Sequence, residues 1–113
     1  MTTCSTHVLD AALGVPAAGL EVFLSTADGD TLATARTDDD GRIRWDAPLE
    51  AGGLPADLAP ATYLVTFATG SWFAAAARET FFPHVQVAAE ISGPHVHVAL
   101  LLSPFSYTTY KGS

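Results

Sequence analysis

Short segments that alternate polar and apolar residues recur along this chain, and turn residues separate them. The longest segment, residues 95–102 with the sequence HVHVALLL, places His95 and His97 on one face of a strand and Val96 and Val98 on the other, because successive strand side chains point to opposite faces. Asp-Gly and Gly-Pro pairs mark turns about every eight to twelve residues. This spacing predicts an all-β fold, a two-sheet antiparallel β-sandwich of immunoglobulin-like size.

One segment carries a helical signal instead. In residues 71–79, Ser71 is placed as an N-cap, a run of alanines follows, and Phe-Phe-Pro at 81–83 closes the helix. Residues 46–60 are rich in proline and glycine and are expected to form a loop. Strands are expected at residues 6–10, 20–25, 31–37, 42–45, 62–68, 84–91 and 95–102, and the last strand is expected to resume at 107–110.

The chain has 113 residues, which fits a single domain spanning residues 1–113. Hydrophobic residues make up 49% of the sequence and charged residues only 15%, which argues against disorder. This apolar share is high for the small surface of such a domain. We therefore expect other subunits to cover part of that surface.

The charge balance and the hydropathy exclude several classes of partner. The formal net charge is −7, whereas nucleic-acid binding needs clustered cations, so no nucleic acid is expected. No apolar stretch approaches the roughly 20 residues of a membrane span, so no membrane is expected either. Residues 1–10 lack the basic region and apolar core of a signal peptide, which predicts a cytoplasmic protein. The lone Cys4 excludes an intrachain disulfide and a cysteine-based zinc site.

The histidines are the first candidates for chemistry. His95 and His97 share a strand face, and His7, next to Val8, is also placed to point away from the core. A His-x-His pair with a third histidine is a plausible set of zinc ligands. No carboxylate lies beside the pair, and surface or interface histidines are the plainer interpretation, so no metal is expected.

Acid–base hydrolysis is the alternative chemistry for these residues. Neutral imidazole takes protons near physiological pH, and an arginine can bind a carbonyl-rich substrate and offset developing negative charge. Arg42 follows an Asp-Gly turn and is placed to project from it, although it could also be a solvated turn residue paired with nearby aspartates. Arg44 shares its face, so periodicity does not separate the two. The chain carries no Ser-His-Asp signature and no glycine-rich phosphate loop.

Seven sequence blocks, taken together, are similar to one known family. They are THVLD (6–10), GVPA (14–17), TDDDGR (37–42), FFP (81–83), HVHV (95–98), LLSPFSY (101–107) and YKGS (110–113). In this order and spacing they resemble the transthyretin-like 5-hydroxyisourate hydrolases over nearly the whole chain. The terminal Tyr-Arg/Lys-Gly-Ser block separates these hydrolases from transthyretin itself, a thyroid-hormone carrier of the same fold.

The resemblance implies a fold, an assembly and a reaction. It implies a two-sheet β-sandwich of the prealbumin type that forms a homotetramer, a dimer of dimers, with active sites between the dimers. It implies that water opens the ring of 5-hydroxyisourate to give 2-oxo-4-hydroxy-4-carboxy-5-ureidoimidazoline, in the degradation of urate. It implies no metal and no organic cofactor.

The resemblance also assigns roles to residues. His7 and His97 are expected to position and deprotonate the attacking water, and Arg42 to bind the polar edge of the substrate; which histidine is the base stays open. The substrate pocket is expected to be lined by Tyr110, Lys111, Gly112 and Ser113, with His95 beside His97. An ordered C-terminal segment is expected because it forms part of this site.

Two departures and two alternatives remain. Lys111 stands where arginine is commoner and loses the planar fork of that side chain, and Ala99 stands where proline is usual. One alternative is a non-catalytic small-molecule carrier with the transthyretin fold, against which His7, Arg42 and His97 argue. The other is a secreted adhesion or interaction module.

Overall fold

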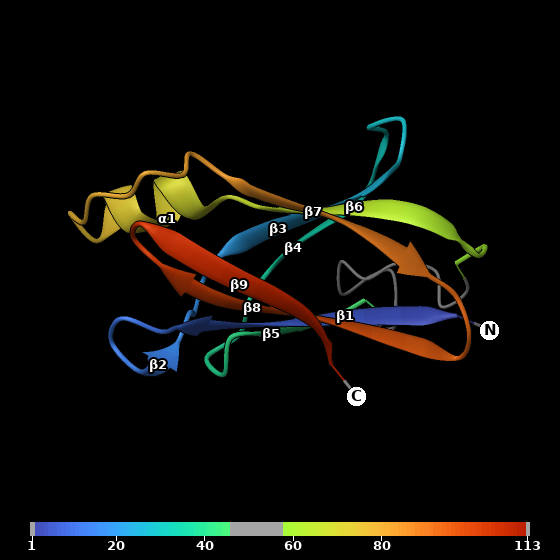
Figure 1. Ribbon diagram of the computed structural model, residues 1–113, viewed down its shortest axis with the longest axis horizontal. Coiled ribbons are helices and arrows are strands. Elements are labelled where there is room, and N and C mark those ends of the chain that lie inside the picture. The colour runs from blue at the N-terminus through green and yellow to red at the C-terminus, as the bar shows by residue number, and fades with distance from the viewer. Residues whose placement is uncertain (1, 46–57, 113) are drawn as a thin grey trace.

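Two β-sheets packed face to face, with one short helix at one end, form the structure (Figure 1). The computed structural model describes residues 2–45 and 58–112. The predicted two-sheet sandwich with a single short helix is therefore confirmed for the described residues. Most of the predicted loop at 46–60, and the predicted site residue Ser113, lie outside the described residues.

The first sheet has four antiparallel strands in the order β4-β3-β6-β7. The β3–β4 hairpin closes over Asp28-Gly29 as predicted, and Gly29 adopts a φ of 95°, which glycine tolerates without strain. Its strands are β3 (Glu21–Thr26), β4 (Thr31–Arg36), β6 (Ala61–Phe67) and β7 (Val85–Ile91).

The second sheet has the order β2-β1-β8-β9, and β5 pairs with β1 next to β2. Its central pair, β1 and β8, is parallel over its whole length, from Thr3 opposite His95 to Asp10 opposite Leu102. The alternation pattern did not indicate this parallel pair, because alternation reports the faces of a strand and not its direction. The strands are β1 (Thr3–Asp10), β2 (Val15–Pro16), β5 (Arg42–Arg44), β8 (His95–Ser103) and β9 (Ser106–Gly112).

The hydrophobic core lies between the two sheets and follows the predicted alternation. In β8, Val96 and Val98 are buried, whereas His95 is exposed and His97 is half-buried. In β1, Val8 is fully buried while its neighbour His7 is only half-buried. The side chains that carry candidate chemistry therefore point away from the core on both strands.

The helix α1 (Thr69–Ala75) begins and ends earlier than predicted. Ser71 lies inside the helix and donates its hydroxyl to the carbonyl of Ala68, so it is not the N-cap. The C-terminus is set by Ala77, which adopts a φ of 54°. The backbone N–H of Arg78 then donates to the carbonyl of Phe73 (2.9 Å), the pattern of a Schellman motif. Alanines at 76 and 77 end this helix, although alanine favours helix elsewhere.

One buried ion pair links the end of β1 to the segment that follows α1. The Arg78 guanidinium donates to Asp10 Oδ2 at 2.6 Å, and the Asp10 side chain is 1% exposed. Arg78 also stacks over the rings of Trp72 and Phe73. Burial by itself raises the pKa of the Asp10 carboxyl, but the hydrogen bond and charge of Arg78, with backbone N–H groups after β1, hold the pKa below its usual range.

Among the described residues, the single helix α1 is far too short to cross a lipid bilayer, and no other helix qualifies as a membrane span. The predicted cytoplasmic location stays a prediction.

Replacing Asp10 with alanine leaves the Arg78 charge without its partner. We expect the free energy of unfolding to fall by about 3 kcal/mol. This is the lower end of the range for removing one partner of a buried ion pair, because the Arg78 side chain is 23% exposed. The matched control is Glu21→Ala, which breaks an exposed pair with Arg36 at 3.8 Å and should cost less than about 1 kcal/mol. Urea denaturation at one fixed protein concentration measures both. Equal losses would show that the Asp10 pair contributes no more than a surface pair.

Candidate active site

The outer face of the five-stranded sheet carries the candidate residues in two adjacent rows that cross four strands. The register of the strand pairs sets these rows, and the side chains between them, such as Thr6 and Val98, face the core. From β5 through β1 and β8 to β9, the rows are Arg42–His7–Ala99–Tyr110 and Arg44–Ser5–His97–Gly112.

The turn before β5 positions Arg42 beside His7. The carboxylate of Asp38 accepts hydrogen bonds from the backbone N–H groups of Asp40 and Arg42, each at 2.9 Å. Gly41 completes the turn with a φ of 77°, and a Cβ there would lie 2.3 Å from the Val8 carbonyl oxygen. Only glycine fits this position, so the Asp-Gly-Arg spacing fixes where Arg42 leaves the turn.

His7 is oriented by the same turn. Its Nε2 lies 3.0 Å from the backbone carbonyl oxygen of Asp40. Because a carbonyl only accepts, Nε2 carries the proton in this contact, and in the neutral ring Nδ1 holds the lone pair. The Arg42 guanidinium has no ion-pair partner within residues 2–45 and 58–112. The alternative in which Arg42 pairs with the aspartates of its own turn is thus not observed: Asp38 binds its backbone instead.

His97 lies half-buried between two strands. Its Nδ1 is 2.7 Å from Ser5 Oγ on β1. On its other side is Gly112 of β9, where a Cβ would lie 2.4 Å from His97 Cδ2. Burial, followed by the positive charges of His7, Arg42 and His95, lowers the pKa of His97 below its ordinary value. His97 is therefore held as a neutral imidazole at physiological pH, the form that accepts a proton.

A cavity of about 410 Å³ opens over these rows. Cations and hydroxyl groups dominate its lining, although the chain as a whole is strongly acidic. The lining residues are Thr3, Ser5, Thr6, Arg42, Ile43, Arg44, His95 and His97. A polar, anion-attracting cavity with a neutral imidazole at its wall suits the addition of water to an electron-poor carbonyl group.

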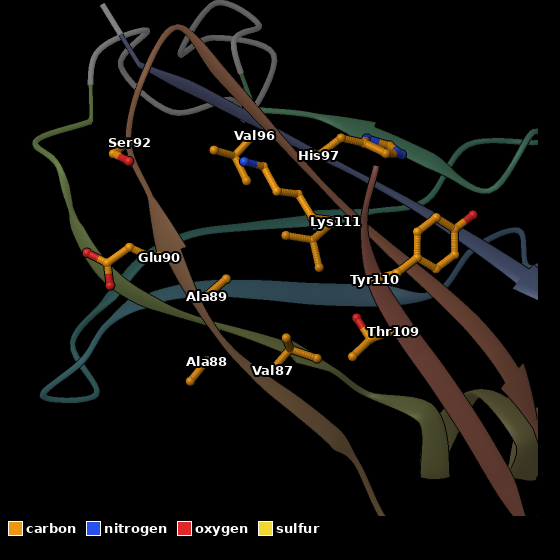
Figure 2. A pocket seen from close by; sticks show the side chains of 11 residues that line it. Val87, Ala88, Ala89, Glu90, Ser92, Val96, His97, Thr109, Tyr110 and Lys111 are labelled. Atoms are coloured by element: carbon orange, nitrogen blue, oxygen red, sulfur yellow. The ribbon is translucent and has the colours of Figure 1, made fainter. Parts of the chain in front are cut away.

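A second cavity of about 410 Å³ lies between the edges of the two sheets. Figure 2 shows β7 residues such as Val87 and Ala89 on one side of it and Thr109 and Lys111 of β9 on the other. His97 reaches the rim of this cavity as well as the first one. The two cavities therefore meet at His97.

The predicted residues of the C-terminal block are divided between the two faces of β9. Gly112 lies opposite His97, and Tyr110 lies opposite Ala99, in the same row as His7. Lys111 lies opposite Val98, on the alternate face, and Figure 2 shows its side chain directed away from the Tyr110 hydroxyl. The structure thus brings His7, Arg42, His97, Tyr110 and Gly112 together on one face, whereas Lys111 lies on the alternate face and meets His97 and Tyr110 only at the second cavity.

Neither a metal site nor a cysteine nucleophile is present among the described residues. No group of three or more His, Cys, Asp or Glu side chains there is arranged to hold a metal ion. Burial raises the pKa of the Cys4 thiol to about 12, so Cys4 is a protonated core residue at neutral pH. The groups that line the site among the described residues are imidazole, guanidinium and hydroxyl groups.

Sequence reasoning missed Ser5 and Thr3, which contact the histidines of β8. Ser5 Oγ lies within hydrogen-bond distance of both His95 and His97. Both residues precede His7 at two-residue intervals, so the alternation of β1 places them on its face. What alternation does not give is the parallel neighbour, β8, and therefore no sequence signal linked them to His95 and His97.

Comparisons with known proteins agree on one family. The model of the HIUase/Transthyretin family matches residues 4–112. The 5-hydroxyisourate hydrolase of Salmonella typhimurium is 42% identical over 114 residues, covering 96% of this chain and 79% of its relative. The structure of Klebsiella pneumoniae 5-hydroxyisourate hydrolase matches with a TM-score of 0.88 at 40% identity, covering 100% of both chains. Sea bream transthyretin, solved in complex with thyroxine, matches with a TM-score of 0.80 at 31% identity, covering 96% of this chain and 93% of the other.

Replacing Gly112 with alanine should displace the His97 ring, because the new Cβ would overlap His97 Cδ2. We expect the imidazole NMR resonances of His97 to shift while the fold is kept. The matched control is Thr108→Ala, an exposed position two rows away on the same face of β9. Unchanged His97 resonances in the Gly112 variant would mean that strand β9 shifts and the His97 ring keeps its position.

Proposed function

Because the chain belongs to the HIUase/Transthyretin family, we propose that it is a 5-hydroxyisourate hydrolase that acts in urate degradation. The observation that carries this proposal is the row of Arg42 and His7 beside the row that holds His97, on one polar face. We further propose that the single domain of residues 1–113 carries the whole activity, without a metal or an organic cofactor.

The names of substrate and product define the bond that breaks. Ring opening of 5-hydroxyisourate gives a carboxy group and a ureido group, so water adds to a ring carbonyl and the bond from that carbon to the ring nitrogen breaks. The water must lose a proton and the leaving nitrogen must gain one. The site therefore needs one group that takes and returns a proton and one that stabilises the oxyanion formed in between.

We assign the proton-transfer role to His97, with His7 beside it. The lowered pKa of His97 keeps it neutral, and its Nδ1 is occupied by Ser5, so Nε2 is the nitrogen left for water. His7 has its Nε2 proton on the Asp40 carbonyl and offers Nδ1 to the same face, where it can orient the water. The sequence did not decide whether His7 or His97 is the base, and this hydrogen-bond pattern favours His97.

We assign the oxyanion and the polar edge of the substrate to Arg42. The guanidinium can donate two parallel hydrogen bonds to a planar, carbonyl-rich ring. Its freedom from an aspartate partner among the described residues leaves that geometry available. Tyr110 is 53% exposed in the same row and is proposed to lie against the substrate.

The other predicted substrate contacts remain proposals of different strength. Gly112 acts through its lack of a side chain, because it leaves room for the His97 ring. His95 lines the cavity and contacts Ser5. Lys111 faces the second cavity, so a contact with substrate would require the site to extend past His97. Ser113 is proposed to line the substrate pocket on the family resemblance alone.

We also propose a homotetramer, a dimer of dimers. In the described residues, β7 and β9 are paired on one side only, and both border the second cavity, so a second copy could extend both sheets at once. Most of the exposed large hydrophobic residues gather on the five-stranded sheet and its turns, where a face-to-face contact would enclose the site. Five of the seven exposed large hydrophobic residues among the described residues lie there, namely Leu13, Val15, Phe105, Tyr107 and Tyr110; the other two are Leu32 on β4 and Phe81 after α1.

Replacing His97 with asparagine should lower kcat by about 10²- to 10⁴-fold, the usual contribution of a general base, while the protein stays folded. Urate oxidase generates 5-hydroxyisourate in the cuvette, and the decay of its ultraviolet absorbance is followed. The matched control is His84→Asn, an exposed histidine outside both cavities, which should keep full activity. Decay at the spontaneous rate with the unaltered, folded protein would overturn the hydrolase and leave the carrier alternative.

The pH dependence follows from the His97 shift. A histidine with a lowered pKa stays neutral to a lower pH than a free imidazole, so the acidic limb of kcat/KM should have its midpoint below the ordinary value of 6.5. At pH values above that limb, kcat/KM should no longer depend on the ionisation of His97. Rates measured from pH 4.5 to 8 test this, and a midpoint above 6.5 would contradict a base in this environment.

The assembly is checked by light scattering on a gel-filtration column. We expect a mass close to four times the 11.8 kDa of one chain. The tetramer should dissociate to dimers only on strong dilution. Tyr110→Asp places a charge at the proposed face-to-face contact and should yield a dimer. A fully active monomer would exclude the proposal that the site lies between dimers.

A further inference from the structure

A continuous chain of hydrogen-bonding side chains leads away from His97, and beyond Ser5 it has no role in the mechanism above. Ser5 Oγ lies 2.7 Å from His97 Nδ1 and 2.9 Å from His95 Nε2. His95 Nδ1 in turn lies 2.5 Å from Thr3 Oγ1. Thr3 Oγ1 also reaches the backbone carbonyl of Pro94 at 3.4 Å. The path alternates between the parallel strands β1 and β8 and ends at a backbone carbonyl.

The carbonyl at the end of this path gives one proton order. The Pro94 carbonyl can only accept; it takes the backbone N–H of Thr3 at 3.2 Å and, in this order, also the single hydroxyl proton of Thr3 at 3.4 Å. Thr3 Oγ1 must then accept from His95 Nδ1–H, which leaves His95 Nε2 as an acceptor in the neutral ring. Ser5 donates its one proton to that nitrogen and must accept from His97 Nδ1–H. Each hydroxyl group thus donates once and accepts once.

From this geometry we infer that Thr3, His95 and Ser5 are positioning residues that fix His97 in the tautomer with its proton on Nδ1 and its lone pair on Nε2. The inference deepens the proposed function and rests on it for its catalytic meaning. A histidine held this way presents only its basic nitrogen to the cavity. Gly112 packs against the opposite side of the ring and prevents it from turning away from Ser5.

The same path can relieve His97 of positive charge during the reaction. When His97 Nε2 takes the proton of water, the Nδ1 proton can pass to Ser5 Oγ while the Ser5 proton passes to His95 Nε2. The charge then lies on His95, which is exposed, instead of on the half-buried His97. As Nε2 releases its proton to the leaving ring nitrogen, the two shifted protons return, and the starting state is restored.

The charged and titratable groups around His97 favour the transfer of positive charge from His97 to His95. Positive neighbours oppose a charge that stays on His97, while His95 lies one row further from Arg42. The groups that face or border His97 are His7 of β1, Arg42 and Arg44 of β5, His95 of β8, Tyr110 and Lys111 of β9, and Glu90 of β7.

The first test reads the tautomer directly and needs no substrate. Long-range ¹H–¹⁵N correlation spectra distinguish protonated from unprotonated ring nitrogens. In the full-length protein above pH 7 we expect His97 to show its proton on Nδ1. In Ser5→Ala the population should move toward the Nε2-protonated form. Ser5→Thr, which keeps the hydroxyl, should restore the original signal.

The second test separates positioning from substrate binding. With 5-hydroxyisourate as substrate, Ser5→Ala should lower kcat roughly ten- to a hundred-fold, less than the loss of the base itself, with KM changed by less than about twofold. Thr3→Val removes the far end of the path without changing its shape and should give a smaller loss in the same direction. The matched controls are Ser25→Ala, a serine of similar burial in the other sheet, and Thr34→Val on β4.

The outcomes of the two tests are distinguishable. A His97 ring protonated on Nε2 in the unaltered protein would overturn the inference even if hydrolysis is observed. A tautomer and kcat that stay unchanged in both Ser5→Ala and Thr3→Val would overturn it as well. If the unaltered protein fails to hydrolyse the substrate, the proposed function fails, and the tautomer spectra still decide whether the path fixes His97.

Discussion

The parallel pairing of β1 with β8 is the constraint on which the rest of the site depends. It joins residues about ninety positions apart and places Thr3 opposite His95 and Ser5 opposite His97. Strands β5 and β9 then add Arg42 and Gly112 on either side of this pair. A slip of one residue between β1 and β8 would turn every one of these side chains into the core or away from its partner.

The site gathers positive charge on a strongly acidic protein. Arg42 and Arg44 lie on the face that holds His7 and His97, while the net charge of the chain is −7. A local positive field of this kind would attract the carbonyl-rich substrate proposed above. The same field, together with burial, keeps His97 neutral. In the proposed function, substrate binding and proton abstraction therefore depend on one arrangement of charges.

Much of this could be predicted from local pattern. Alternation gave the burial of Val96 and the outward position of His7, and the Asp-Gly turn gave the exit point of Arg42, because these depend on residues a few positions apart. The helix boundaries at 71–79 were wrong, since a left-handed Ala77 and not a proline ends the helix. Lys111 was expected to line the substrate pocket; it lies opposite Val98 on the alternate face of β9 and lines the second cavity, so that expectation stays a prediction.

By itself, the sequence determined the strand faces, the turns and the family, and the family resemblance proposed the set of His7, Arg42 and His97. Only the tertiary structure decided which strands lie together, and so which hydroxyl group meets which imidazole. Alternation is a property of one strand and repeats every two residues, so it carries no information on the partner strand or its direction. The contact of Ser5 with His97 and the fit of Gly112 against the same ring exist only once β1, β8 and β9 are paired in register.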